Sequence, residues 1–186
     1  MPRRIAILAG AFNPLTRAHI ALANAASSVT DQILCVVPRV YPHKELEGAT
    51  LEQRLEMLRR ARSDFPVEVT DGGLFIEVAR ELRLKHPDSE LYFVCGRDAA
   101  ERILNWDYGE AGFVDRMLEE FGLLVADRQG EFAVPERFRH RVIPIRIEGQ
   151  FDHVSSTEVR RRIQTGEPWE HLVPDEILDL VRQVYR

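Results

Sequence analysis

The chain has 186 residues, with 25 Lys and Arg against 30 Asp and Glu and a formal net charge of −5. This acidic balance disfavours a dedicated binder of duplex nucleic acid, which needs a basic surface. No apolar run reaches membrane-spanning length, and the first residues lead into a strand-like segment, unlike a signal peptide. We expect one globular domain over 1–186, located in the cytoplasm and bound neither to nucleic acid nor to a membrane.

Short apolar runs alternate with helical segments along the chain. Buried strands are predicted over 4–9, 32–37, 67–69, 91–95, 123–126 and 142–147. Helices are predicted over 16–26, 50–63, 74–85, a segment ending at 104, a segment ending near 121, 155–163 and a last stretch from 174. This alternation predicts an α/β protein with right-handed crossovers and a mostly parallel sheet.

Two cysteines, Cys35 and Cys95, stand in apolar runs without metal or redox spacing. We expect both to be buried thiols of a cytosolic protein. In a parallel sheet, ligands bind outside the carboxyl ends of the strands, where the strand order reverses. The loops to inspect are therefore 10–16, 38–49, 96–98 and 148–156.

The first of these loops reads Gly10-Ala-Phe-Asn-Pro-Leu-Thr-Arg-Ala-His19. A glycine lets the backbone approach a ligand, and the start of the following helix supplies free N–H groups for an anion. Thr16 and His19 are three residues apart, so on a helix they share one face. The alternative is a tight strand–helix turn in which His19 only caps the helix. Neither the dinucleotide glycine pattern nor the Walker lysine loop is present.

A second helix start reads Ser155-Ser-Thr-Glu-Val-Arg160. Its hydroxyls and free N–H groups also suit an anion, and Arg160 lies one turn further along the helix. The alternative is an ordinary capping box followed by a surface arginine.

Other single residues stand on or near the remaining loops. Lys44 is one of only two lysines, and its loop position suits contact with a phosphate, although a solvated loop lysine is the plainer interpretation. Gly96 and Asp98 follow a strand, where Asp98 would accept from a sugar or base, or simply cap the next helix. Trp106 would stack on a planar ring or pack in the core, whereas Trp169 is assigned to the core.

Taken together, these segments resemble a known superfamily. Residues 10–19 resemble the Gly-x-Phe-x-Pro-x-(His or Thr)-x-Gly-His signature of the nucleotidyltransferases, and residues 154–160 resemble their Ile-Ser-Ser-Thr-x-x-Arg signature. Lys44 in Pro-His-Lys, Asp98 in Gly-x-Asp, Trp106 and the end of the chain are similar to features of bacterial nicotinate-nucleotide adenylyltransferases.

The resemblance implies a Rossmann-like three-layer sandwich with a helical C-terminal extension over 156–186. It implies adenylyl transfer from ATP to nicotinate mononucleotide, giving deamido-NAD and pyrophosphate, with Mg²⁺ held through substrate phosphates and no metal site of the protein's own. The residues implied in catalysis are His19, Thr16, Lys44 and Arg160. ATP binding is implied for Gly10, Ala11, Phe12, Gly96, Asp98, Ser155, Ser156 and Thr157, and mononucleotide binding for Asn13 and Trp106.

The chain also departs from the family pattern. Thr16 replaces the more usual histidine and Ala18 the glycine before His19, and residues 71–77 replace a Tyr-Thr-x-x-Thr-Leu segment that helps to bind the mononucleotide. Nicotinamide mononucleotide or phosphopantetheine as acceptor therefore remains open, as does a non-catalytic nucleotide-binding relative. The sequence is also compatible with a homo-oligomer.

Overall fold

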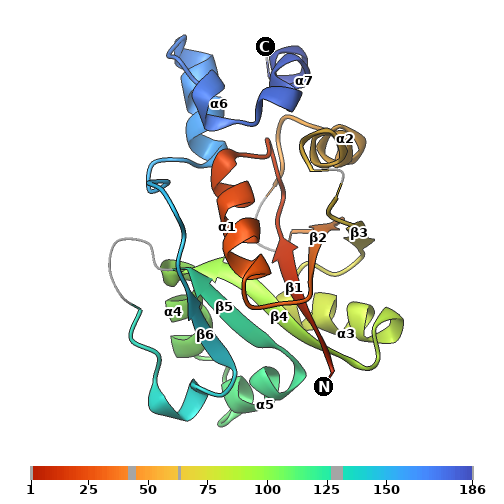
Figure 1. Cartoon of the computed structure of the whole chain (residues 1–186), viewed down its shortest axis with the longest axis vertical. Helices are drawn as coiled ribbons and strands as arrows, with labels where there is room; N and C mark the ends of the chain where they lie inside the picture. The colour runs from red at the N-terminus through yellow and green to blue at the C-terminus, as the bar shows by residue number, and fades with distance from the viewer. Residues whose placement is uncertain (1, 42–44, 63, 127–131, 186) are drawn as a thin grey trace.

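A computed structural model of the chain describes residues 2–41, 45–62, 64–126 and 132–185 (Figure 1). Its centre is a six-stranded sheet in the order β3-β2-β1-β4-β5-β6, in which every neighbouring pair is parallel. The strands are β1 (Arg3–Ala9), β2 (Gln32–Pro38), β3 (Val67–Thr70), β4 (Ser89–Gly96), β5 (Gly122–Ala126) and β6 (Val142–Ile145). The predicted α/β class and parallel sheet are confirmed.

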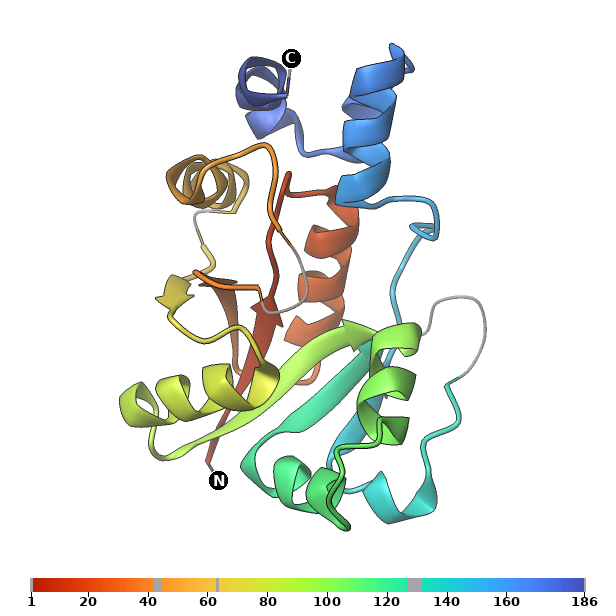
Figure 2. The ribbon, with the colours of Figure 1, turned by 180° about the vertical axis from the view of Figure 1, so that it is seen from behind.

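Helices cover both faces of this sheet. They are α1 (Arg17–Ser27), α2 (Leu51–Ala61), α3 (Phe75–Lys85), α4 (Arg97–Asn105), α5 (Phe113–Glu120), α6 (Ser156–Thr165) and α7 (Leu178–Val184). Figure 1 looks onto the side that carries α1, and Figure 2 shows α3, α4 and α5 on the opposite side. The three-layer Rossmann-like sandwich is confirmed.

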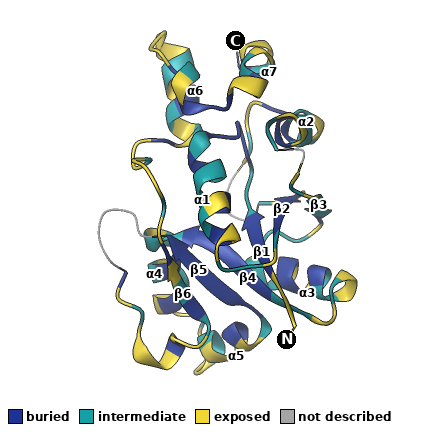
Figure 3. Ribbon diagram, in the orientation of Figure 1, coloured by how far each residue is buried: buried dark blue, intermediate teal, exposed yellow. Residues whose placement is uncertain are grey.

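Alternation along the strands divides the core between the two faces. Ala6 and Leu8 of β1 face a cluster that includes α1, α2 and the C-terminal helices, whereas Ile5 and Ile7 face a cluster with α3, α4 and α5. The inner strands β2, β1, β4 and β5 are buried along most of their length, whereas the edge strands β3 and β6 are less buried (Figure 3). Because both faces are covered, the strands read as continuous apolar runs in the sequence.

Several element boundaries differ from the prediction. β6 ends at Ile145, because this strand forms the edge of the sheet and carries a proline. α6 continues to Thr165 and stops at Gly166, whose φ of 72° forms a left-handed cap. The last α-helix begins only at Leu178, after a 3₁₀ turn over Asp175–Ile177.

Two helix starts have capping-box spacing in the sequence, Thr50 with Gln53 and Ser155 with Glu158, and they behave differently. At the start of α2 the box is complete: Gln53 N–H donates to Thr50 Oγ1 at 3.2 Å, and Thr50 N–H donates to Gln53 Oε1 at 2.8 Å. At the start of α6 only one half forms, with Glu158 N–H donating to Ser155 Oγ at 3.1 Å. The Glu158 carboxylate instead pairs with Arg161 and Arg162.

Cys35 and Cys95 are buried as predicted, and burial raises the pKa of each thiol to about 12. Both are therefore protonated at neutral pH. Within the described ranges, no helix combines the length and apolarity that crossing a bilayer requires.

Candidate active site

The loop between β1 and α1 lies at the point where the strand order reverses. β1 pairs with β2 on one side and with β4 on the other. Residues 10–16 therefore leave the carboxyl edge of the sheet where the strand order changes from β2 and β3 on one side to β4, β5 and β6 on the other. Open α/β sheets bind ligands in this crevice.

Thr16 and His19 are in contact at the start of α1. Thr16 N–H donates to His19 Nδ1 at 3.0 Å, and Thr16 Oγ1 lies 2.8 Å from the same nitrogen. Since Nδ1 accepts from a backbone N–H, the neutral ring carries its proton on Nε2. The buried Phe12 ring packs edge-on against the imidazole, with ring centroids 5.1 Å apart. His19 therefore does cap Thr16, and this contact also fixes the orientation of the ring.

The start of α6 is hydrogen-bonded to this same loop. Ser156 Oγ donates to the carbonyl oxygen of Pro14 at 2.7 Å, and Arg160 Nη1 donates to that of Asn13. The bonded residues are 142 and 147 positions apart in the sequence. In Figures 1 and 2 the first turns of α1 and α6 lie next to each other. Two helix N-termini are thus joined on one loop.

A helix N-terminus has backbone N–H groups without intrahelical partners and the positive end of the helix dipole. Two such ends side by side favour an anionic ligand more than either does alone. The hydroxyls of Ser155 and Ser156 are used within the protein, as cap and loop tie, so the donors that the helix geometry leaves for a ligand here are backbone amides. Thr157 is exposed at this end.

Asn13 is a buried hub and not an open binding group. Its side chain is 1% exposed. Nδ2 donates to the Glu47 carbonyl at 2.6 Å, while Oδ1 accepts from Ala49 N–H at 3.2 Å and from the Tyr185 hydroxyl. Burial raises the pKa of Tyr185 above its ordinary value, which keeps this hydroxyl a donor. The predicted contact between Asn13 and a mononucleotide stays a prediction.

Two further residues hold this loop and were missed in the sequence. Arg54 of α2 donates to the Ala11 carbonyl at 3.0 Å and to the Tyr41 hydroxyl at 3.1 Å, and Tyr41 donates to the Gly10 carbonyl at 3.2 Å. A signal for Arg54 existed, because it lies three and four residues before Met57 and Leu58 on the apolar face of α2. Nothing in the pattern singles out Tyr41.

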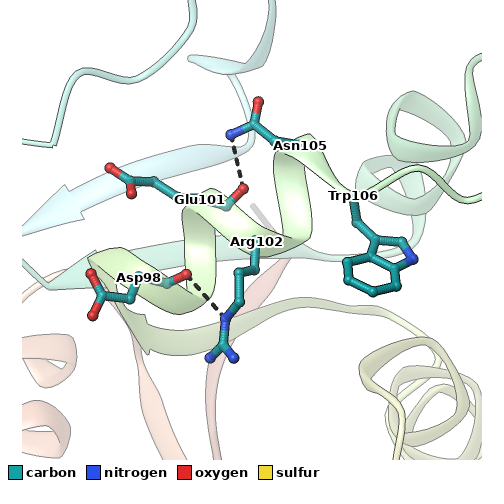
Figure 4. A pocket seen from close by; sticks show the side chains of 5 residues that line it. All are labelled: Asp98, Glu101, Arg102, Asn105 and Trp106. Carbon is teal, nitrogen blue, oxygen red and sulfur yellow. Dashed lines mark hydrogen bonds between the residues drawn. The ribbon is translucent and has the colours of Figure 1, made fainter.

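A separate cavity of about 680 Å³ lies along α4 (Figure 4). It is lined by Asp98, Glu101, Arg102, Asn105 and Trp106. The structure thus brings Asp98 and Trp106 to one cavity, at opposite ends of α4, with Gly96 as the residue that precedes the helix. Trp106 is 65% exposed, so it is not a core residue, whereas Trp169 is buried as predicted.

Lys44, with the adjoining 42–43, lies outside the described residues, so its predicted place beside the phosphates stays a prediction. In the ranges that the structure covers, no group of three or more His, Cys, Asp and Glu could hold a metal ion. The donors around residues 10–16 and 155–160 are amides, hydroxyls, an imidazole and arginine, a set that suits phosphate oxygens and not a bare cation.

Comparison with known proteins agrees with this arrangement. The model of the cytidylyltransferase-like family matches residues 7–162, which include both helix starts. The chain belongs to the cytidylyltransferase-like family. This membership accounts for the two phosphate-type signatures occurring in one chain and in this order.

Similar family members are named for one activity. A probable nicotinate-nucleotide adenylyltransferase of Carboxydothermus hydrogenoformans is 30% identical over 96% of this chain and 94% of its own length. Another, from Thermus thermophilus, is 32% identical over 92% of each chain. The solved nicotinic acid mononucleotide adenylyltransferase of Plasmodium falciparum, complexed with NaAD, has a TM-score of 0.77 at 19% identity, covering 97% of this chain and 95% of that one. At that identity the likeness shows the fold alone.

Proposed function

We propose that this protein transfers the adenylyl group of ATP to nicotinate mononucleotide and releases pyrophosphate. The observation that carries the proposal is the joining of two helix N-termini on residues 13–14 by Ser156 and Arg160. A polyphosphate is the ligand that fills such a double anion site best. The curated relatives, named as adenylyltransferases over almost their full length, support the same reaction.

The chemistry needs no nucleophile from the protein. A phosphate oxygen of the mononucleotide forms a bond to the α-phosphorus of ATP, and the bond from that phosphorus to the bridging oxygen breaks, so pyrophosphate leaves with the electron pair. The protein has to align two anions and stabilise the charge that shifts onto the leaving group. Nε2–H of His19 and the amides at the starts of α1 and α6 are donors of this type, and Arg160 and Lys44 would add positive charge.

The cavity along α4 offers groups of a different kind. By the family resemblance, Gly96 and Asp98 would lie by the adenosine half and Trp106 against the pyridine ring. An exposed indole suits stacking on a planar ring, and a carboxylate accepts from hydroxyls or an exocyclic amine. These roles, like those of Gly10, Ala11, Phe12 and Thr157, are part of the proposal.

We also propose Mg²⁺ as the metal of the reaction. When bound to the substrates, Mg²⁺ neutralises phosphate oxygens and polarises the α-phosphate. It would be held by phosphate oxygens, because the protein donors around residues 10–16 are hydrogen-bond donors and not carboxylates. This chain's own part is to hold the phosphates in place.

One observation is a reason to test nicotinamide mononucleotide as a second acceptor beside nicotinate mononucleotide. In the segment that departs from the family pattern, the amides of residues 71–74 all donate to the carboxylates of Glu77 or Glu81, at 2.7 to 3.0 Å. These amides are therefore not available to an anionic group of the acceptor. Nicotinamide mononucleotide carries a neutral amide where nicotinate carries a carboxylate, so this acceptor belongs in the same experiment.

The test is to mix the purified protein with ATP, Mg²⁺ and one acceptor at a time, and to follow pyrophosphate release. We expect turnover with nicotinate mononucleotide and formation of deamido-NAD. Faster turnover with nicotinamide mononucleotide would keep the chemistry and change the acceptor. Tight ATP binding without pyrophosphate from any acceptor, including phosphopantetheine, would overturn the proposal in favour of a nucleotide sensor.

A further inference from the structure

Arg54 is a buried cation without an anionic partner among the described residues. Arg54 is 4% exposed, and no carboxylate forms an ion pair with it in the part of the chain that the structure describes. Its Nε is buried and lacks a hydrogen-bond partner there. Burying an arginine in this way is unfavourable unless its other contacts compensate. The compensating contacts that the structure shows all lead to the loop after β1.

These contacts fix the orientation of two consecutive peptide groups. Arg54 Nη1 holds the Ala11 carbonyl at 3.0 Å, and the Tyr41 hydroxyl, itself bonded to Arg54, holds the Gly10 carbonyl at 3.2 Å. In a planar trans peptide the C=O and the following N–H point in opposite directions. The N–H groups of Ala11 and Phe12 must therefore face away from Arg54 and Tyr41.

These two N–H groups have no partner within the described residues. The loop itself lies between α2, which carries Arg54, and the adjoining starts of α1 and α6 (Figures 1 and 2). The two amides thus face away from Arg54 and Tyr41, the side chains that hold their peptides. This is the arrangement expected of amides kept for a ligand.

The loop would not keep this shape without help. Phe12 has a φ of 49°, a left-handed conformation that is unfavourable for a residue with a bulky side chain. Such a conformation persists when surrounding contacts determine it, and the bond from Arg54 to the Ala11 carbonyl acts on the peptide directly before Phe12. Tyr41 stays a donor because burial raises the pKa of its hydroxyl, against the opposite effect of Arg54.

We propose that Arg54 is a positioning residue which, with Tyr41, holds the Ala11 and Phe12 amides toward the nucleotide phosphates. Its buried charge lies beneath the same loop and adds to the attraction for an anion. Arg54 does not touch substrate in this proposal and acts through the two carbonyls. The inference rests on the proposed function for the identity of the anion, and it extends that function by assigning residues outside both signatures.

The first test observes the amides directly and needs no turnover. We would record ¹⁵N–¹H spectra of the full chain while adding α,β-methylene-ATP with Mg²⁺. In the wild type, the Ala11, Phe12 and Thr157 resonances should all shift. In Arg54→Lys, which keeps the charge but loses the planar fork, the Ala11 and Phe12 shifts should be lost and that of Thr157 retained. Unchanged Ala11 and Phe12 shifts in a folded Arg54→Lys protein would overturn the proposal.

The second test uses steady-state kinetics with ATP and the acceptor. Arg54→Lys should lower kcat/KM for ATP about 100-fold, as removal of preorganised donors does, and change KM for the acceptor less than twofold. A merely structural defect would lower kcat in proportion to the inactive fraction and leave both KM values unchanged, and that result would contradict the proposal. Arg60→Lys is the matched control, since Arg60 lies on the same helix and pairs with Glu56 at the surface.

Tyr41→Phe keeps the experiment decisive if Arg54→Lys fails to fold. It removes only the hydroxyl bonded to the Gly10 carbonyl, so the Ala11 shift should fall and the Phe12 shift persist. If the wild type releases no pyrophosphate with any acceptor, the proposed function fails while the amide titration still decides this inference. If turnover is found but the Ala11 and Phe12 resonances do not shift when the nucleotide is added, the inference alone fails.

Discussion

The two halves of the candidate site are built in opposite ways. Around residues 10–16, long-range hydrogen bonds come from Tyr41, from α2 and α6, and from Tyr185, the C-cap residue of α7. They reach four loop residues: Gly10, Ala11, Asn13 and Pro14. Along α4, the hydrogen bonds drawn in Figure 4 stay within the helix: Arg102 to the Asp98 carbonyl and Asn105 to the Glu101 carbonyl. One half is fixed by the fold, and the other is an exposed helix face.

This difference matches the demands of the proposed reaction. Stabilising charge on a transferring phosphoryl group requires donors that are in place beforehand, because reorganisation during the reaction costs rate. Recognising a sugar or a ring tolerates more freedom, since stacking is broad in its geometry. We therefore expect substitutions in the fixed half to affect turnover and those along α4 to affect the affinity for one substrate.

The largest effect should come from His19→Ala. This change removes the Nε2–H donor and leaves the Thr16 amide without its Nδ1 partner, so we expect kcat to fall about 10²-fold or more. Pyrophosphate release measures the loss, and far-UV circular dichroism checks the fold. His86→Ala is a control, because that histidine is the C-cap residue of α3 and pairs with Glu68 of β3. Near-normal turnover of a folded His19→Ala protein would count against the fixed half as the reacting centre.

A smaller loss should follow when the ties to the loop are removed. Arg160→Met leaves the Asn13 carbonyl without its charged donor and should lower the free energy of unfolding by about 2 kcal/mol, together with a loss in kcat/KM for ATP. Arg161→Met is the matched control for the tie to the loop, since Arg161 lies on the same helix and, among the described residues, pairs with Glu158 and Glu167 and not with residues 10–16.

Tyr185→Phe separates the tie from a direct substrate contact. It removes the hydroxyl bonded to Asn13 Oδ1 and no group that we place on the nucleotide, and it should cost about 1 kcal/mol of stability. A several-fold loss in kcat/KM for ATP in this variant would show that the shape of the loop matters for turnover. If the kinetic constants of Tyr185→Phe equal those of the wild type, the hydrogen bond to Asn13 serves stability alone.

On the α4 side, Trp106→Ala should act on the acceptor alone. Stacking of an aromatic ring contributes about 0.5–1.5 kcal/mol, so KM for the pyridine mononucleotide should rise roughly two- to tenfold while KM for ATP stays unchanged. The melting temperature should also be unchanged, because the side chain is 65% exposed. Quenching of Trp106 fluorescence by the acceptor, measured against the variant that keeps Trp169, gives a second readout. Equal changes in both KM values would remove Trp106 from the acceptor site.

The sequence predicted the parts of the site that depend on local patterns. A strand followed by a glycine-containing loop and a helix start is readable along the chain, and so is the serine cap of α6; the sheet order then brings them to one edge. The contacts that hold Asn13 come from Glu47, Ala49 and Tyr185, which are 34 to 172 residues away. No local pattern specifies such partners.

Competition between neighbours explains other failures. The predicted capping box at Ser155 needs the Glu158 side chain, but two arginines at the next turn of α6 hold that carboxylate instead. Likewise the spacing of Arg54 from Met57 and Leu58 places it on the apolar face of α2, but no local pattern specifies that it bonds the Ala11 carbonyl and the Tyr41 hydroxyl. The prediction from residue type was weakest where a charged residue has several partners to choose from.

The smallest effect should be a pH dependence that arises at α6. Hydrogen bonds from Arg161 and Arg162 lower the pKa of Glu158 to about 2 from its ordinary 4.5. Because the folded-state pKa is the lower one, the stabilisation by this network is present above about pH 4.5 and is lost as the pH falls through about 2. The melting temperatures of the wild type and Glu158→Gln should therefore differ at pH 6 and converge by pH 2.

Glu119→Gln is the control for this comparison, since Glu119 is exposed on α5 and forms no ion pair among the described residues. Its melting temperature should follow that of the wild type throughout. If the difference in melting temperature between the wild type and Glu158→Gln stays constant from pH 6 to 2, the Glu158 side chain acts at the helix start by its shape and not by its charge. If this difference disappears at low pH, the contrast between the two halves extends to pH. Acid would then weaken α6, the helix bonded to residues 13 and 14, and would not affect the exposed face of α4.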